Sequence, residues 1–298
     1  MKLLNFGSLN LDYVYSVEHF VQAGETVASE RLEQFAGGKG LNQSVAFARA
    51  GAETYHAGLI GAEGEMLRQT LTDSGVDTGN VRTVDGISCG HAIIQVTPAG
   101  ENCILLFGGA NRQITDPFID EVLSDFGAGD WLMLQNEING LDSIIQRAHA
   151  KGMTVILNPS PCDERITALD LSRIDWLILN ETEGCQITGK REPEAILETL
   201  LCRYPYMKVV LTLGSRGSVY ADRSTRAEQD IFPVRAVDTT AAGDTFTGYF
   251  FSSVMAGKTP AEALRIASAA SALAVSRKGA APSIPRMEEV LTFLSTAV

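Results

Sequence analysis

Three apolar runs share one pattern, and this pattern constrains the fold more than any other feature of the sequence. TVILNPSP (154–161), DWLILNETE (175–183) and VVLTLGSRG (209–217) each begin as a continuous apolar stretch and end in polar residues or glycine. Helical segments alternate with these runs, including one at 192–204 with Pro193 in its first turn. Such alternation is typical of a parallel sheet with both faces covered by helices. We therefore expect an α/β fold of three layers, α/β/α, with a central, mostly parallel sheet.

In such sheets ligands bind beyond the carboxyl ends of the strands. Polar residues and glycine stand at these ends in all three runs, so we expect their side chains and loops to face one crevice. The residues concerned are Asn158, Asn180, Glu183, Thr212 and Gly214.

Two regions have a different pattern. Segments 8–27 and 88–107 contain short stretches rich in Val, Ile, Tyr and Leu, with a turn signal at Pro98-Ala99-Gly100. We interpret them as antiparallel strands of a small separate β-sheet that packs over the crevice as a lid. The chain is then one domain, 1–298, with lid strands inserted at about 8–36 and 88–108.

Composition narrows the functional classes. Of 298 residues, 45% are hydrophobic and 20% are charged, as in ordinary globular proteins, and the net charge of −12 lacks the basic footprint of nucleic-acid or anionic-membrane binding. The apolar run at the N-terminus is too short for a signal peptide, and no run reaches the length of a membrane span. The five cysteines form no Cys-x-x-Cys pair, which favours free thiols in a reducing cytoplasm over a zinc site.

Asp244 lies in an unusual setting, VDTTAAGDTFTG (237–248). The pattern predicts a strand at 234–237, a turn at Ala241-Ala242-Gly243, and a helix at 244–255. Free N–H groups at a helix start, together with the positive end of the helix dipole, form an anion site, and small residues let the anion approach. Asp244 would then lie beside the anion as a possible base. The alternative is that Asp244 only caps the helix.

A second glycine-rich segment, FAGGKGLNQSVAFARAG (35–51), is not a phosphate-binding Walker A loop. That motif requires Ser or Thr after Gly-Lys and an earlier Gly, but these places hold Gly40 and Glu33. The glycines at 58–64 form only a loose turn, for which packing is the favoured explanation.

Six motifs together carry a family resemblance. GSLNLD (7–12), GGKGLNQ (37–43), LNETE (179–183), LTLGSRG (211–217), DTTAAGDTF (238–246) and RKGAAPSIP (277–285) occur in the order found in the ribokinase-like carbohydrate kinases, the PfkB family. The match spans nearly the whole chain. The sequence therefore resembles that family, and the resemblance implies a ribokinase-like fold with a β-sheet lid.

The resemblance also implies an activity, namely transfer of the γ-phosphoryl group of ATP, with Mg²⁺, to a sugar hydroxyl. Asp244 would accept the hydroxyl proton, and the N–H groups of Ala241, Ala242, Gly243 and Asp244 would hold the transferring group. The sugar would contact Asn10, Asp12, Gly38, Lys39, Asn42, Glu137 and Asp244. Taken singly, Asn10 and Asp12 also fit turns, and Lys39 and Glu137 also fit solvated positions.

For the nucleotide and metals, the resemblance implies two further sets of residues. The nucleotide would contact Asn180, Thr212, Gly214, Gly217, Gly243 and Ser268, and Glu183 would bind Mg²⁺ through water. A K⁺ ion that activates the enzyme would be bound by Asp238, Thr240, Ala274, Arg277, Gly279 and Ser283. A turn or cap role is the alternative for Asp238. The family's lids clasp one another, which implies a homodimer.

The expected substrate is D-ribose, phosphorylated at its 5-hydroxyl. Ala92 and Leu106 should line the apolar side of the sugar pocket, while His91 should point away because neighbouring strand residues alternate faces. Cys89 and His91 flank the predicted lid strand, and if His91 pointed inward, preference could shift to 2-deoxyribose or another small sugar. A nucleoside kinase, a fructose-phosphate kinase and an inactive sugar-binding regulator are the alternatives. The presence of Asp244, Gly243 and Lys39 argues against the regulator.

Overall fold

The three apolar runs form neighbouring strands of one large sheet. In the computed structural model, which describes residues 1–296, they are β9 (Thr154–Asn158), β10 (Trp176–Asn180) and β11 (Lys208–Thr212). β10 pairs in parallel with both β9 and β11. The predicted strands and their direction are therefore confirmed, and Asn158, Asn180 and Thr212 end them at the same edge of the sheet.

Within residues 1–296 the sheet has nine strands, in the order β13-β12-β11-β10-β9-β8-β1-β4-β5. The pairings from β11 to β5 are all parallel, whereas β12 and β13 add an antiparallel hairpin at one edge. The remaining strands are β1 (Leu3–Phe6), β4 (Thr54–Ile60), β5 (Asp77–Thr83), β8 (Trp131–Gln135), β12 (Ser218–Ala221) and β13 (Arg226–Gln229).

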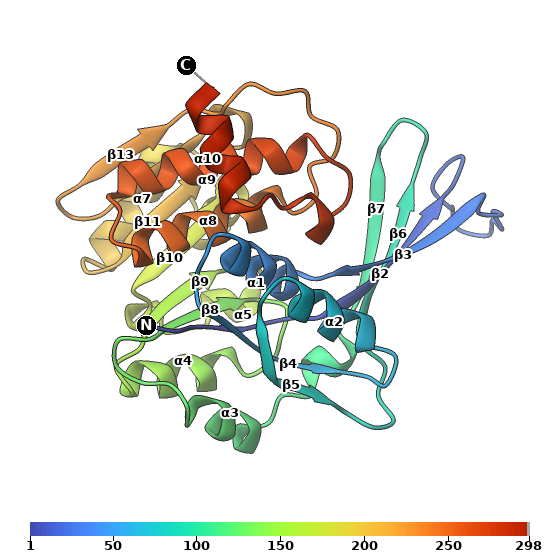
Figure 1. The fold of residues 1–298 in the computed structure, drawn as a ribbon, viewed down its shortest axis with the longest axis horizontal. Coiled ribbons are helices and arrows are strands. Elements are labelled where there is room, and N and C mark those ends of the chain that lie inside the picture. The colour runs from blue at the N-terminus through green and yellow to red at the C-terminus, as the bar shows by residue number, and fades with distance from the viewer. Residues whose placement is uncertain (297–298) are drawn as a thin grey trace.

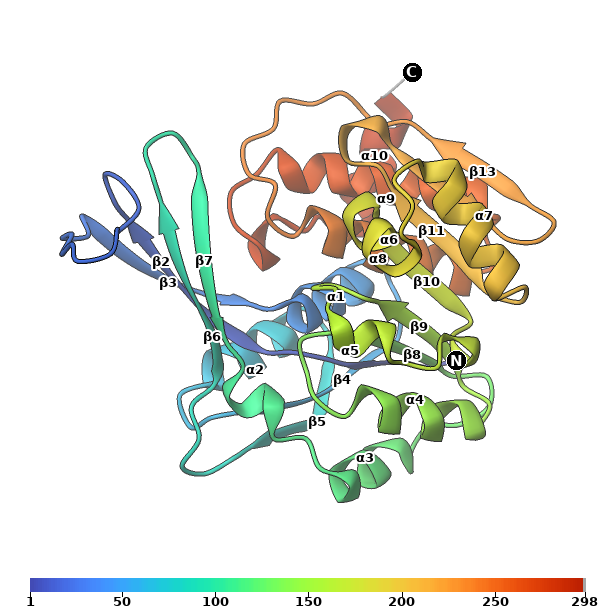
Figure 2. The ribbon, with the colours of Figure 1, turned by 180° about the vertical axis from the view of Figure 1, so that it is seen from behind.

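Helices cover both faces of this sheet, which confirms the three-layer fold. One face carries α1 (Lys39–Arg49), α2 (Glu65–Asp73), α8 (Ala242–Met255), α9 (Pro260–Val275) and α10 (Met287–Thr296) (Figure 1). The other carries α3 (Asp116–Leu123), α4 (Leu141–Ala150), α5 (Glu164–Thr167), α6 (Glu181–Thr188) and α7 (Pro193–Arg203) (Figure 2). Two separate apolar clusters fill the spaces between the layers. In the described part of the chain, no helix combines the length and the apolar character that a bilayer crossing requires.

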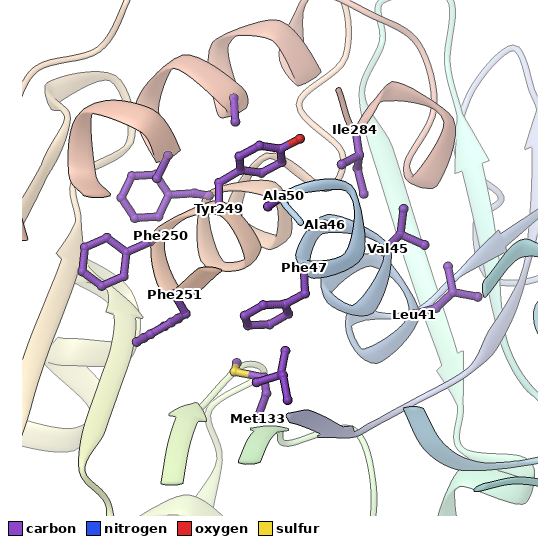
Figure 3. Packing of buried hydrophobic residues seen from close by; sticks show 14 of the residues in the cluster. Leu41, Val45, Ala46, Phe47, Ala50, Met133, Tyr249, Phe250, Phe251 and Ile284 are labelled. Carbon is purple, nitrogen blue, oxygen red and sulfur yellow. The ribbon is translucent and has the colours of Figure 1, made fainter. Parts of the chain in front are cut away.

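Helices α1 and α8 pack unusually closely. Phe47 of α1 lies in one buried apolar layer with Phe250 and Phe251 of α8 and Met133 of β8 (Figure 3). At Gly248 of α8 an added Cβ would lie 2.4 Å from the Cβ of Ala46, which no side chain tolerates. The absence of a side chain at Gly248 therefore lets the two helices that begin at the GGKG and AAGD segments approach each other.

The lid is a separate four-stranded sheet that projects from one side of the body (Figure 1). Its order is β3-β2-β6-β7, formed by β2 (Asn10–Ser16), β3 (Arg31–Gly37), β6 (Gly90–Val96) and β7 (Asn102–Phe107). The β2–β3 and β6–β7 pairs are antiparallel as expected, but β2 and β6 are parallel. The expectation of an all-antiparallel lid is wrong because β2 and β6 continue from β1 and β5, which run in the same direction in the central sheet.

The expected strand at 234–237 is absent. In its place, residues 230–239 form an irregular and largely exposed segment that contains Pro233, which has no N–H to donate to a ladder. The N–H groups of Val237 and Asp238 both donate to the carbonyl of Val275, at the end of α9. This segment therefore packs on a helix end, and the helix that follows begins at Ala242, two residues earlier than predicted.

Candidate active site

Helix α8 begins at a sharp turn of the backbone. Ala241 has φ 59°, the one positive φ among the non-glycine residues of 1–296, and this strained conformation is common at functional sites. The first helical hydrogen bond runs from the N–H of Thr245 to the carbonyl of Ala241 (2.8 Å). The N–H of Ala242 donates to the carbonyl of Thr239 (3.3 Å), whereas those of Gly243 and Asp244 have no acceptor within the helix. The start of α8 can therefore hold an anion.

The carboxylate of Asp244 is buried and is held by two amides of α1. Asn42 Nδ2 donates to Asp244 Oδ2 (3.1 Å), and Gln43 Nε2 donates to Asp244 Oδ1 (2.9 Å). The side chain is 8% exposed. A capping carboxylate would instead accept from N–H groups of its own helix. These contacts with a second helix indicate a function other than capping.

Charged residues of the predicted sugar site lie close to this carboxylate. Glu137 accepts hydrogen bonds from the hydroxyl of Ser8 and from the N–H of Lys39 (3.0 Å). Burial lowers the pKa of the Lys39 ammonium, but the charges of Asp244, Glu137 and Glu183 outweigh it, so the pKa is raised. Burial, and then the charge of Glu137, raise the pKa of Asp12 to about 7. Lys39 thus remains a cation between carboxylates.

The lid strand β2 contributes Asn10 and Asp12 to the same region. Asn10 Oδ1 accepts from Asn111 Nδ2 (2.7 Å). At Gly37, on the neighbouring strand β3, an added Cβ would lie 1.9 Å from Asp12 Oδ2. Gly38 follows with φ 91° and forms the turn into α1. Asn10 and Asp12 are therefore strand residues, not turn residues, and glycine makes room for the carboxylate.

The crevice at the carboxyl ends of the strands contains a cavity of about 220 Å³. Lys39, Asn158, Asn180, Glu183, Thr212 and residues 241–244 line it. Four of the five strand-end residues predicted to face one crevice thus lie around it together with the start of α8. The fifth, Gly214, lines the adjoining cavity.

This second cavity, of about 590 Å³, has a mainly apolar lining. All six residues predicted to contact a nucleotide line it: Asn180, Thr212, Gly214, Gly217, Gly243 and Ser268. Phe232, Val234, Ala272 and Val275 supply apolar surface of the kind that accommodates a flat base. The two cavities share Asn180, Thr212, Thr239, Ala242 and Gly243, so they adjoin at the start of α8.

Glu183 suits the predicted role in binding Mg²⁺. It forms a capping box with Asn180, in which each side chain accepts from the other residue's N–H (2.9 and 3.0 Å). The side chain is 6% exposed and lines the smaller cavity near Asn158. A carboxylate with nearby amide oxygens is the kind of donor set that Mg²⁺ and its waters prefer.

Asp238 connects the turn before α8 to the segment after α9. Its Oδ1 accepts from the N–H (2.9 Å) and hydroxyl (2.6 Å) of Thr240, and its Oδ2 accepts from the N–H of Gly279 (2.9 Å). These bonds are those of a turn residue, the alternative considered for Asp238. They also bring two of the predicted cation-binding segments together.

His91 lies on the face of the lid opposite Asp12, and Cys89 lies in the apolar core. The His91 ring packs against Tyr13 and Phe107, with ring centroids 6.0 and 5.0 Å apart. Asp12 pairs in register with Ala92, so the two share the opposite face of the lid. The Cys89 thiol is buried and accepts from the N–H of Gly61 (3.1 Å). The expected orientation of His91 is confirmed, as is a packing role for the Gly58–Gly64 turn.

Sequence reasoning missed four buried polar residues that support the site: Ser8, Gln43, Asn111 and Gln135. Gln43 stood in the quoted GGKGLNQ motif, and Gln135 ends an apolar strand, WLMLQ, as the other strand-end residues do. Those signals could have identified both. Nothing in the sequence pattern pairs Asn111 with Asn10, which is 101 residues away.

Comparison with known proteins agrees with this geometry. Residues 1–287 match the family described as pfkB family carbohydrate kinase. A ribokinase from Haemophilus influenzae is 36% identical over 299 residues, covering 98% of this chain and 97% of that protein. A ribokinase from Staphylococcus aureus is 33% identical, covering 97% and 98%. The solved structure of Arabidopsis thaliana ribokinase complexed with ribose and ATP has a TM-score of 0.87 at 34% identity, covering 98% of each chain.

The raised pKa of Asp12 predicts how stability depends on pH. Because the folded state binds this proton more tightly than the unfolded state, stability is lost as pH rises from near 4 through about 7. The loss is at most about 4 kcal/mol, and less because Asp12 is partly exposed. Between about pH 5 and about pH 8 the loss from Asp12 is about 3 kcal/mol or less, and His56, whose pKa burial lowers to about 3, contributes in the opposite direction. The loss is therefore measured as the difference in urea unfolding between the unaltered ligand-free protein and Asp12→Asn at these two pH values. Asp12→Asn should reduce it, whereas Asp142→Asn, at an exposed position of α4, should not. Equal pH dependence in Asp12→Asn and the unaltered protein would contradict the assignment.

Proposed function

The chain belongs to the pfkB family of carbohydrate kinases, and we propose that it transfers the γ-phosphoryl group of ATP to the 5-hydroxyl of D-ribose. The relatives named above, which are 33–36% identical over nearly the full length, are ribokinases, and one solved relative is complexed with ribose and ATP.

One observation carries the proposal most directly. The buried Asp244 carboxylate lies in the first turn of α8, where a small polar cavity adjoins a larger apolar one. The polar cavity includes Lys39, and the apolar cavity has the size and lining for a nucleotide base and ribose. This arrangement supports a reaction in which the acceptor hydroxyl and the phosphoryl donor meet at one helix start.

The chemistry follows from the residues at this junction. Asp244 accepts the proton of the sugar hydroxyl as that oxygen attacks the γ-phosphorus. The N–H groups at the start of α8 and the Lys39 ammonium stabilise the charge on the transferring phosphoryl oxygens. ATP would bind together with Mg²⁺; Glu183 would hold this ion through water, and the ion would supply positive charge that neutralises the phosphates. The protein therefore acts mainly by positioning and by electrostatics.

Specificity for a small free sugar is supported by the lid. Asn10, Asp12 and Glu137 offer side-chain oxygens that suit adjacent hydroxyls, while Gly38 and Lys39 lie at the turn into α1. His91 faces away from this group, so it supplies no reason to prefer a deoxy sugar. D-ribose is therefore proposed ahead of 2-deoxyribose, hexoses and nucleosides.

The proposal is tested by measuring ADP release with ribose, 2-deoxyribose, fructose, adenosine and fructose phosphate as acceptors. Ribose should give the highest kcat/KM. A value at least about tenfold higher for adenosine or a hexose, equivalent to about 1.4 kcal/mol of transition-state binding, would overturn ribose specificity. No turnover with any acceptor would overturn the kinase assignment.

Substitution of Asp244 tests the proposed base. Asp244→Asn keeps the shape of the side chain but cannot accept a proton, so kcat should fall by about 10²- to 10⁴-fold. Affinity for sugar should change much less, because Asn still hydrogen-bonds a hydroxyl. Steady-state kinetics with ribose and ATP measure both. A variant that keeps more than about a tenth of the original kcat would exclude Asp244 as the base.

Activation by K⁺ is proposed from the position of Asp238. The six residues of the proposed K⁺ site lie in two parts of the chain that Asp238 connects. One part is directly before the start of α8 and the other is at and after the end of α9; the residues are Asp238, Thr240, Ala274, Arg277, Gly279 and Ser283. A bound cation would stabilise the turn that presents N–H groups to phosphate. Initial rates should therefore drop when tetramethylammonium replaces K⁺ at constant ionic strength. Equal rates in the two salts would refute this role.

A homodimer through the lid is proposed from the apolar edge of that sheet. Ile104, Leu105, Leu106 and Phe107 of the edge strand β7 are each more than half exposed. An uncovered apolar edge strand invites pairing with another chain. Light scattering at micromolar concentration should give the dimer mass, and Leu105→Lys should give the monomer. Leu291→Lys, at an exposed position of α10, is the control, and a monomeric unaltered protein would contradict the proposal.

A cytoplasmic location is proposed from the cysteines and from the need for ATP. All five cysteines are free thiols, as expected from the sequence, and such thiols persist in reducing compartments. We also propose that residues 1–298 act as one kinase domain, since the family match extends from residue 1 to 287.

A further inference from the structure

A network of buried side-chain amides extends from the Asp244 carboxylate into the interior of the protein. Gln43 Nε2 donates to Asp244 Oδ1 (2.9 Å) and to Asn158 Oδ1 (3.4 Å). Gln43 Oε1 accepts from Gln135 Nε2 (2.6 Å), and the same nitrogen donates to Asn5 Oδ1 (3.0 Å). Gln43, Gln135 and Asn5 are each at most 1% exposed. The network therefore lies in the interior, between α1 and the ends of β1 and β8.

Two groups that can only accept hydrogen bonds determine the orientation of every amide in this network. At one end, the Asp244 carboxylate requires the NH₂ of Gln43, so Gln43 Oε1 must face Gln135. At the other end, the carbonyl of Gly40 accepts from Asn5 Nδ2 (2.8 Å), so Asn5 Oδ1 must also face Gln135. Gln135 meets both requirements only with its NH₂ toward the two oxygens. Its own Oε1 is buried and has no hydrogen-bond partner, which is the cost of that orientation.

We propose that Gln43, held in one orientation by Gln135, is a positioning residue for Asp244. It directs the Asp244 carboxylate toward the acceptor hydroxyl and keeps this carboxylate ionised, so that it can accept a proton. The inference rests on the proposed function of Asp244. The second carboxylate oxygen is held by Asn42 (3.1 Å), which is itself a proposed sugar contact and can exchange partners when sugar binds. Gln43 is 1% exposed and is not a proposed sugar contact, and its other acceptor, Asn158 Oδ1, lies farther from Nε2 (3.4 Å) than Asp244 Oδ1 does (2.9 Å). It is therefore the constant partner of the carboxylate through the reaction.

The physical basis is the sensitivity of a buried carboxylate to its donors. Hydrogen bonds to a carboxylate favour its charged form, and loss of a donor in a buried site is costly. The other charged groups of this region are Lys39 on α1, Glu137 after β8 and Glu183 on α6. Lys39 supports the negative charge and the two glutamates oppose it. The amide of Gln43 is neutral, so its hydrogen bond orients the Asp244 carboxylate without adding a charge to the site.

Two near-isosteric substitutions test this role by steady-state kinetics over a range of pH. Gln43→Met removes the donor to Asp244. Gln135→Glu removes the donor to Gln43 and places there a carboxylate that competes with Asp244 for the single NH₂ group of Gln43. Both variants should lower kcat at least about tenfold while KM for the sugar changes less than about threefold. The acid limb of the kcat–pH profile should move to higher pH by at least about half a unit.

A neighbouring buried amide provides the matched control. Asn136 follows Gln135 and donates to the carbonyl of Pro161 (2.7 Å) and to Asp163 (3.0 Å), outside the network. Asn136→Leu should lower the melting temperature without moving the acid limb of the profile. If Gln43→Met and Gln135→Glu also lower only the melting temperature, or lower kcat with an unmoved acid limb, the role is structural and the proposal is wrong.

Nuclear magnetic resonance tests the contact without turnover. The side-chain NH₂ resonances of Gln43, identified by their loss in Gln43→Met, should shift as pH falls through the acid limb. In Asp244→Asn this shift should be absent. Resonances that do not respond to pH, or that respond equally in Asp244→Asn, would overturn the proposal. The proposed function is judged separately, because it depends on kcat of Asp244→Asn and not on the amide resonances.

Discussion

The negative charge of Asp244 is buried between two helices, and the centre of the molecule is arranged to keep that charge hydrogen-bonded. An isolated carboxylate in such a place would be strongly disfavoured, so each of its oxygens receives an amide donor from α1. This is possible only because α1 and α8 approach closely at Gly248 and Ala46. The close contact of the helices and the chemistry at their N-termini are therefore one structural feature.

The same helix start lies between the two proposed substrate sites. On one side lie Lys39, Glu137 and the lid strand that carries Asp12, and on the other lies the apolar cavity beneath Phe232 and Val275. Because the parallel strands all end at this edge of the sheet, the loops that follow them reach both sides. The lid strands β2 and β6 continue from central strands, so the lid side chains Asn10 and Asp12 are attached directly to the core.

Strand and helix positions were largely predictable because apolar periodicity is a local property. Runs such as 154–161 and 209–217 form strands where the pattern indicates, and Pro193 lies at the start of its helix. The strand expected at 234–237 was wrong, since an apolar stretch with Pro233 found hydrogen bonds at the end of α9 instead of a sheet edge. The parallel pairing of β2 and β6 depends on the direction of strands far away in the sequence, which no local pattern contains.

For the site, the sequence by itself determined which residues lie at strand ends and helix starts. Short segments such as GGKG and AAGD specify turns and helix starts through their own small residues, without contacts from elsewhere in the chain. Only the tertiary structure decided which of them meet. Asp244 and Gln43 are 201 residues apart, and Gln135 and Asn5 are 130 apart, yet these four form one hydrogen-bonded group. Their contact depends on the packing of α1 on α8 and on the order of β1 and β8 in the sheet. Those long-range arrangements bury apolar surface and pair polar groups over the whole chain. A single segment cannot satisfy this requirement, so it cannot be predicted from any one segment.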